Sequence, residues 1–137
     1  MASSYREGDK LPTVERLITQ ERIQRYAEAS GDFNPIHIDP GFAALSQFGG
    51  TIAHGMLIAA LVSEAMAVGF TRDWVETGRL KLRFRAPVKP GDRVATFGKV
   101  KRVREADGGS EIVCSVGVSK PDGESAVTGE AVVRART

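Results

Sequence analysis

The stretch HGMLIAALVSEAMAVG, residues 54–69, decides the fold of this chain. Apolar residues occupy nearly every position around its helical turns, so the stretch predicts a helix that is buried on most sides. It contains Glu64, and its longest uncharged run falls short of the ~20 residues that a membrane span needs. We therefore expect a long helix in the centre of a protein core, with another part of the chain wrapped around it.

The sequence after this helix predicts the layer that wraps it. Leu80, Leu82 and Phe84 alternate with basic residues, which indicates a half-buried strand. Further strands are expected at residues 94–103, 112–118 and 126–136. Gly98 indicates a possible bulge in the second of these four strands. Because short turns join consecutive strands, we expect an antiparallel sheet and a single α+β domain over residues 1–137.

The segment before the central helix is expected to be irregular. Residues 11–18 predict a strand or an extended arm, and Thr19 is the expected cap of a short helix that ends near Gly31. Pro35 disfavours helical backbone at the preceding residue, so a loop should follow this helix. Asp39, followed by a proline, predicts the start of another short helix.

The composition is that of a folded protein, with 42% hydrophobic and 26% charged residues among 137. The net charge is only +2, so neither nucleic acid nor an anionic membrane is expected as the main partner. Cys114 is the single cysteine and cannot form an internal disulfide. The first ten residues contain no apolar stretch like that of a signal peptide, and we expect a cytoplasmic protein. With two histidines in the sequence, no metal site is expected, and without a Gly-x-Gly-x-x-Gly or Walker pattern no cofactor is expected.

One short loop carries the residues that predict chemistry. Asp32 and His37 lie five positions apart in GDFNPIH, residues 31–37, where the proline stiffens the backbone. We expect apolar Phe33 and Ile36 to anchor this loop. A carboxylate and an imidazole held together can share one water molecule and move its protons.

The start of the central helix carries a second candidate site. His54 and Gly55 lie where free backbone N–H groups point out of the helix N-terminus. Gly55 has no side chain, so a substrate can approach its backbone closely. Such a donor suits a carbonyl oxygen that gains negative charge during proton transfer.

These motifs together resemble one family. GDFNPIHIDP (31–40) and IAHGM (52–56), followed by FRAPV (84–88), are similar to the signature of MaoC-like dehydratases and (R)-specific enoyl-CoA hydratases. The resemblance implies a hotdog fold, a long helix held in a curved antiparallel sheet, and a dimer of such units. It also implies roles for individual residues: Asp32 and His37 as the catalytic pair, the Gly55 N–H on the thioester carbonyl, Asn34 in shaping the loop, and Ser63 as a supporting polar residue.

Several residues keep a second interpretation. His54 could contact substrate, but a structural hydrogen bond at the helix start is the alternative that we favour. Ser63 could bond back to a carbonyl of its own helix instead of serving the site. The basic residues of the first strand after the helix could meet coenzyme A phosphates or form a solvated face. These residues are Arg79, Lys81, Arg83 and Arg85.

The function that we expect is the interconversion of trans-2-enoyl and (R)-3-hydroxyacyl thioesters by water that Asp32 and His37 activate. A hotdog thioesterase would use a similar site, and the chain could also be the catalytic subunit of a heterodimeric dehydratase. A non-enzymatic interaction module is a further class, although it would leave the loop of Asp32 and His37 without a role. The acyl chain length stays open, as does the choice between coenzyme A and acyl carrier protein as carrier.

Overall fold

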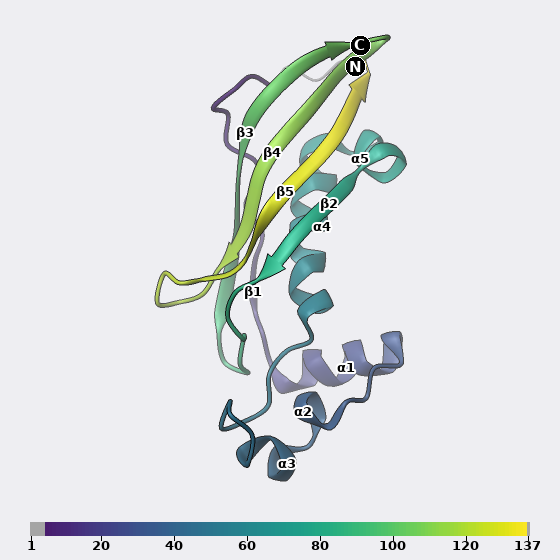
Figure 1. The fold of residues 1–137 in the computed structure, drawn as a ribbon. Coiled ribbons are helices and arrows are strands. Elements are labelled where there is room, and N and C mark those ends of the chain that lie inside the picture. Colours follow the sequence, from purple (N-terminus) through teal and green to yellow (C-terminus); the bar gives the residue numbers. More distant parts are fainter. Residues whose placement is uncertain (1–4, 137) are drawn as a thin grey trace.

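The computed structural model describes residues 5–136 and shows one curved antiparallel sheet with the longest helix along its concave side (Figure 1). The strands are β1 (Glu15–Leu17), β2 (Arg79–Phe84), β3 (Arg93–Ala106), β4 (Gly109–Ser119) and β5 (Ser125–Arg136). The helices are α1 (Gln20–Ser30), α2 (Pro35–Ile38), α3 (Pro40–Ala44), α4 (Gly55–Phe70) and α5 (Arg72–Thr77). The expected α+β fold with a helix in an antiparallel sheet is confirmed.

The order of strands across the sheet is β1-β3-β4-β5-β2. Strands β3, β4 and β5 form the centre of the sheet, joined by two tight turns in which Gly108 and Gly123 have positive φ angles of 76° and 88°. Strand β2 comes before them in the sequence but pairs with β5, so that β1 and β2 form the two edges. The core lies between this sheet and α4, and its largest fully buried side chains include Met66, Ile112 and Val133.

Helix α4 is less completely covered than its composition predicts. Ile58, Val62 and Met66 face the core, but Met56 and Val68 are mostly exposed, and Glu64 lies between them on the solvent side. The prediction of burial on most sides therefore fails for one stripe of the helix. A sheet that curves around a helix covers only the side it faces, so this apolar stripe is left for another contact.

Strand β2 also differs from the sequence-based expectation of a half-buried strand. Five of its six residues are exposed, including Leu80 at 37% and Phe84 at 56%. The alternation is real, because Leu80 pairs with the buried Ala131 while the basic residues point to the opposite face. The strand is exposed because it is an edge strand, with a neighbour on only one side.

The bulge predicted at Gly98 is in the wrong place. The register of β3 and β4 shifts between Val100 and Arg102, so Lys101 is the extra residue. Gly98 serves a different purpose, since a Cβ atom there would come within 2.7 Å of the Leu11 side chain. The glycine allows the N-terminal arm to pack closely over β3, where the Leu11 N–H donates to the Gly98 carbonyl.

Helices α1, α2 and α3 gather beyond one end of the sheet, next to the start of α4 (Figure 1). The Thr19 hydroxyl accepts the Arg22 N–H and caps α1, and Gly31 ends that helix with a φ of 79°. Asp39 caps α3 as expected, and this helix ends at Ala44. Among the described residues, no helix is long and apolar enough to cross a membrane.

Candidate active site

The loop between α1 and α2 is held by its own polar side chains. The Asp32 carboxylate accepts the Asn34 N–H at 3.2 Å, and the Asn34 side chain accepts the Ile36 N–H at 3.1 Å, which caps α2. Phe33 is 50% exposed, so the expectation that it anchors the loop is wrong. Asn34 thus takes part in two of the hydrogen bonds of this turn.

His37 lies on α2 with its ring fixed from one side. Its Nδ1 lies 2.8 Å from the Ile52 carbonyl oxygen, which can only accept a hydrogen bond. Nδ1 therefore carries the proton in the neutral ring, and Nε2 is left as a free base. The Gln20 side chain donates to the His37 carbonyl at 2.8 Å and accepts the Thr51 hydroxyl at 2.7 Å. This bridge ties α1 and α2 to the segment that leads into α4, and no sequence pattern pointed to Gln20.

His54 lies next to Asp32 and His37 and is only 2% exposed. Its Nε2 donates to the Asp32 carbonyl oxygen at 2.9 Å, so its Nδ1 is an acceptor, and this atom has no partner. The ring stacks on that of His37 with centroids 3.9 Å apart and contacts Tyr26 at 4.8 Å. The geometry thus favours the structural interpretation of His54 over substrate contact.

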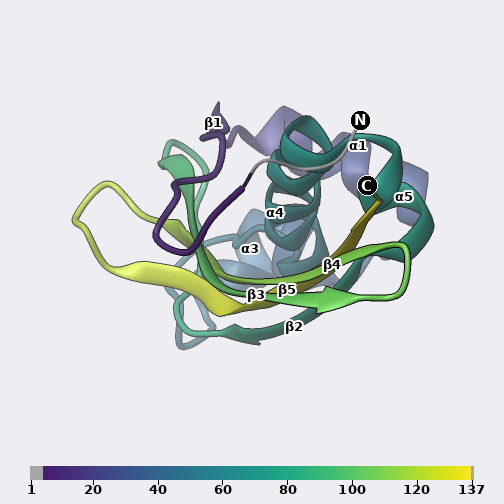
Figure 2. The same ribbon diagram turned by 90° about the horizontal axis from the view of Figure 1, so that it is seen from above.

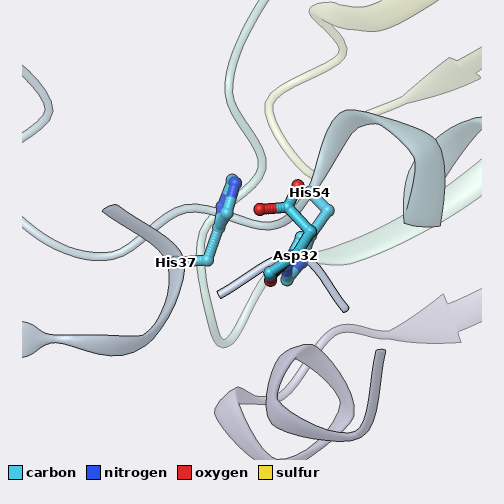
Figure 3. A group of neighbouring side chains, drawn as sticks. All are labelled: Asp32, His37 and His54. Carbon is cyan, nitrogen blue, oxygen red and sulfur yellow. Dashed lines mark hydrogen bonds between the residues drawn. The ribbon is translucent and has the colours of Figure 1, made fainter. Parts of the chain in front are cut away.

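Asp32, His37 and His54 gather at one point from three segments of the chain (Figure 3). One carboxylate oxygen and one nitrogen of each ring all lie within 4.8 Å of one another. Both rings donate to backbone carbonyls, and among the described residues no hydrogen bond joins the Asp32 carboxylate to either ring. Two groups spaced in this way can both reach one water molecule.

The same three side chains could be read as a metal site, but the stacking of the rings argues against a shared ion. An imidazole binds a metal in its ring plane, at about 2.0–2.1 Å for zinc. The His37 and His54 planes are only 23° from parallel with centroids 3.9 Å apart. No single point lies in both planes at that distance, so an ion could take at most one of the two rings.

Gly55 and His37 line one cavity of about 300 Å³. The first hydrogen bonds of α4 run from Leu57 and Ile58 to the His54 carbonyl, which leaves the Gly55 N–H without an acceptor among the described residues. The rest of the wall is mainly apolar, with Phe48, Ile52, Ile58, Phe84 and Val88. A cavity of this kind suits an acyl chain beside a few polar groups.

Ser63 is not part of this cavity. Its hydroxyl accepts the Trp74 indole N–H at 2.9 Å, and it lines a separate pocket between α4, α5 and β2. Ser63 therefore holds the Trp74 ring by a hydrogen bond, and neither residue lines the cavity at His37.

A helix wrapped by a curved antiparallel sheet, with a carboxylate and an imidazole beside its N-terminus, defines the class of hotdog-fold acid–base enzymes. A family model described as "MaoC like domain" matches residues 4–120, and the chain belongs to this family.

Named relatives agree with this membership. The (R)-specific enoyl-CoA hydratase of Aeromonas caviae is 35% identical over 134 residues, which cover 97% of either chain. The 3-hydroxybutyryl-CoA dehydratase of Methylorubrum extorquens is 31% identical, with 88% of this chain and 75% of that protein covered. The solved (R)-hydratase of A. caviae superposes with a TM-score of 0.82 at 32% identity, covering 96% of this chain and 98% of the other.

Proposed function

We propose that this protein is a hydro-lyase that interconverts trans-2-enoyl and (R)-3-hydroxyacyl thioesters of coenzyme A or acyl carrier protein. The observation that carries the proposal is the spacing of Asp32 and His37, which fits one shared water beside the cavity that Gly55 lines. The names of the similar proteins, an enoyl-CoA hydratase and a hydroxybutyryl-CoA dehydratase, support the same reaction.

The geometry supports a simple course for hydration. His37 Nε2 and the Asp32 carboxylate bind a water molecule, and its oxygen forms the new bond to C3 of the enoyl group. The electron pair of the double bond moves toward the thioester oxygen, where the Gly55 N–H stabilises the negative charge. A proton taken from the water is returned to C2, so the pair ends in its starting protonation state. The addition involves no net oxidation, so this reaction needs no redox cofactor.

The proposed working unit is a homodimer of single-domain chains in the cytoplasm. The support for a second copy is the open edge of β2, with Leu80 and Phe84 exposed beside it, and the apolar stripe on α4. A heterodimer, in which this chain is the catalytic subunit, would use the same surfaces.

The catalytic pair is tested by substitution. Asp32→Ala and His37→Ala should each lower turnover of a trans-2-enoyl-CoA by about 10²-fold or more, because each removes a group that moves protons. The double variant should be little slower than either single variant, since the two residues act as a unit. Asp39→Asn is the matched control, because it removes a nearby carboxylate and keeps the cap of α3. Near-normal turnover in either single variant would remove the assignment.

The alternatives give different results with the same protein. A thioesterase would release free thiol from the substrate, whereas a hydratase leaves the thioester intact and forms the (R)-3-hydroxy product. A catalytic subunit of a heterodimer would be inactive when purified alone and would gain activity with its partner. Chain lengths are compared by supplying a series of enoyl-CoA substrates.

A further inference from the structure

Within residues 5–136, the helices all lie on one side of the sheet and none covers the opposite face (Figure 2). We call this the outer face, defined by the side chains of Lys81 and Arg83 on β2 and of Thr128 and Glu130 on β5. The register places Arg83 opposite Thr128 and Lys81 opposite Glu130. These residues alternate with the core-facing ones, so basic groups line the outer face where β2 forms the edge.

The acidic groups near this face are already paired. Glu111 lies 2.7 Å from Arg104 and 3.7 Å from Arg79, and the Lys101 ammonium donates to Glu130 at 2.9 Å. The hydrogen bond from Lys101 lowers the pKa of the Glu130 carboxyl, and the charges of Lys101, Arg102 and Lys81 act in the same direction. Beyond these pairs, no carboxylate of the described residues lies within 4.0 Å of the Arg83 or Arg85 guanidinium.

Arg85 connects the outer face with the cavity. It follows β2 directly and lines the cavity that His37 and Gly55 share. Its Nε donates to the Thr128 hydroxyl at 3.0 Å, which holds the guanidinium in place while the two terminal nitrogens stay available. Lys89 provides a second cation, because its ammonium donates at 2.9 Å to the carbonyl of Phe48, another residue of the cavity wall.

We infer that Arg85, together with Lys89 at the Phe48 side of the same cavity, binds a phosphate of the carrier that holds the acyl group. The inference rests on the proposed function, because a thioester bound at Gly55 must lead its carrier arm out of this cavity. Coenzyme A and acyl carrier protein share a phosphorylated pantetheine arm, and coenzyme A has further phosphates on its nucleotide. A guanidinium that presents two N–H groups side by side matches the oxygens of a phosphate.

The test compares three substrates with the same enoyl group, carried by coenzyme A, phosphopantetheine or pantetheine. In Arg85→Gln, KM for the first two should rise about 10-fold or more with kcat nearly unchanged, because binding is lost equally in the ground and transition states. KM for the pantetheine thioester, which has no phosphate, should stay the same. A rise with coenzyme A alone would still support phosphate binding and would assign it to the nucleotide.

Arg79→Gln is the matched control, since Arg79 is the first residue of β2, the strand that Arg85 directly follows, but pairs with Glu111. It should leave all three KM values unchanged. The inference is overturned if Arg85→Gln changes all three substrates alike, or none of them, while the wild-type protein hydrates them. If the wild-type protein hydrates none of the three, the proposed function itself fails.

Discussion

At the scale of single residues, His54 links the parts of the site that the sequence showed only as separate motifs. Its ring bonds to the backbone of Asp32, stacks on His37, and belongs to the residue that precedes Gly55. One buried side chain therefore sets the loop, the base and the start of α4 relative to one another. Its unpartnered Nδ1 costs stability, because a buried acceptor without a hydrogen bond is unfavourable by about 1–3 kcal/mol.

The substitution His54→Phe tests whether His54 positions the Asp32 loop for catalysis or only stabilises the fold. Phenylalanine keeps a ring to stack on His37, removes the tether to the exposed Asp32 and also removes the orphan acceptor. We expect the unfolding free energy to change by no more than about 1 kcal/mol. Turnover should fall about 10- to 100-fold, because the Asp32 carboxylate would no longer be held in position, and a displacement of about 1 Å can cost about 10²-fold in rate. Tyr26→Phe is the control, as it keeps the second ring against His54, and unchanged turnover in His54→Phe would contradict the positioning role.

Cys114 gives a second prediction at this scale. Burial in the core raises the pKa of its thiol from 9.0 to about 12, so the native protein should react only slowly with iodoacetamide. The unfolded chain loses this proton at lower pH than the folded one. Below pH 9 the thiol is protonated in both states and the unfolding free energy is unaffected. Between pH 9 and 12 the unfolding free energy should fall as pH rises, by at most about 1.4 kcal/mol per pH unit. Chemical denaturation across this range should show a steeper loss in the wild type than in Cys114→Ala, and equal slopes would refute the assignment.

At the scale of elements, the approach of β2 to the N-terminus of α4 shapes the cavity. A Cβ atom on Gly55 would come within 2.9 Å of the Phe84 ring, which belongs to the last residue of β2. The Phe84 ring is the outer part of its side chain and more than half exposed, so the ring can rotate away with little loss of stability. A side chain at position 55 would then stand in the cavity itself, where the substrate must reach the Gly55 N–H.

Gly55→Val should lower turnover by about 10²-fold, the loss that follows when one donor to a developing oxyanion is blocked. The same substitution in a Phe84→Ala background distinguishes two causes. If the valine blocks the substrate, the loss persists when Phe84 is truncated, and this is the result we expect from steady-state kinetics. If the loss disappeared in the double variant, displacement of Phe84 would be the cause, and the oxyanion role of Gly55 would be withdrawn.

At the scale of the whole molecule, the two edge strands of the sheet differ in length and in pairing. Strand β1 is a three-residue edge strand, and its Arg16 pairs with Glu64 of α4 at 2.5 Å. Strand β2, at the other edge, has six residues with exposed Leu80 and Phe84. A long open edge with apolar side chains favours pairing with another chain, and we expect that chain to be a second copy in a two-fold arrangement.

Leu80→Asp should therefore weaken the dimer, because it places a charge beside the β2 edge. Leu17→Asp is the matched control at the opposite edge, since Leu17 on β1 is 40% exposed, close to the 37% of Leu80. Light scattering at micromolar concentration should show a dimer for the wild type and for the Leu17 variant, and a shift toward monomer for the Leu80 variant. A stable, fully active wild-type monomer would overturn the proposed assembly.

The sequence alone determined the features that depend on neighbours along the chain. The caps at Thr19 and Asp39, the long apolar helix and the alternation in β2 follow from side chains within a few positions of one another. Asp32 and His37 are also close in sequence, so a stiff turn was enough to predict that their side chains would lie near each other. Local backbone preferences and hydrophobic periodicity act over just this range.

Only the tertiary structure decided which distant residues touch. The bond from His54 to the Asp32 carbonyl spans 22 positions, and Arg85 reaches Thr128 across 43. The bulge lies at Lys101, whereas the space over Gly98 is occupied by Leu11, which is far away in sequence. Ser63 on α4 bonds to Trp74 on α5, a contact that depends on how the two helices pack. Such contacts depend on strand register and on packing between elements, which the pattern along a single segment does not contain.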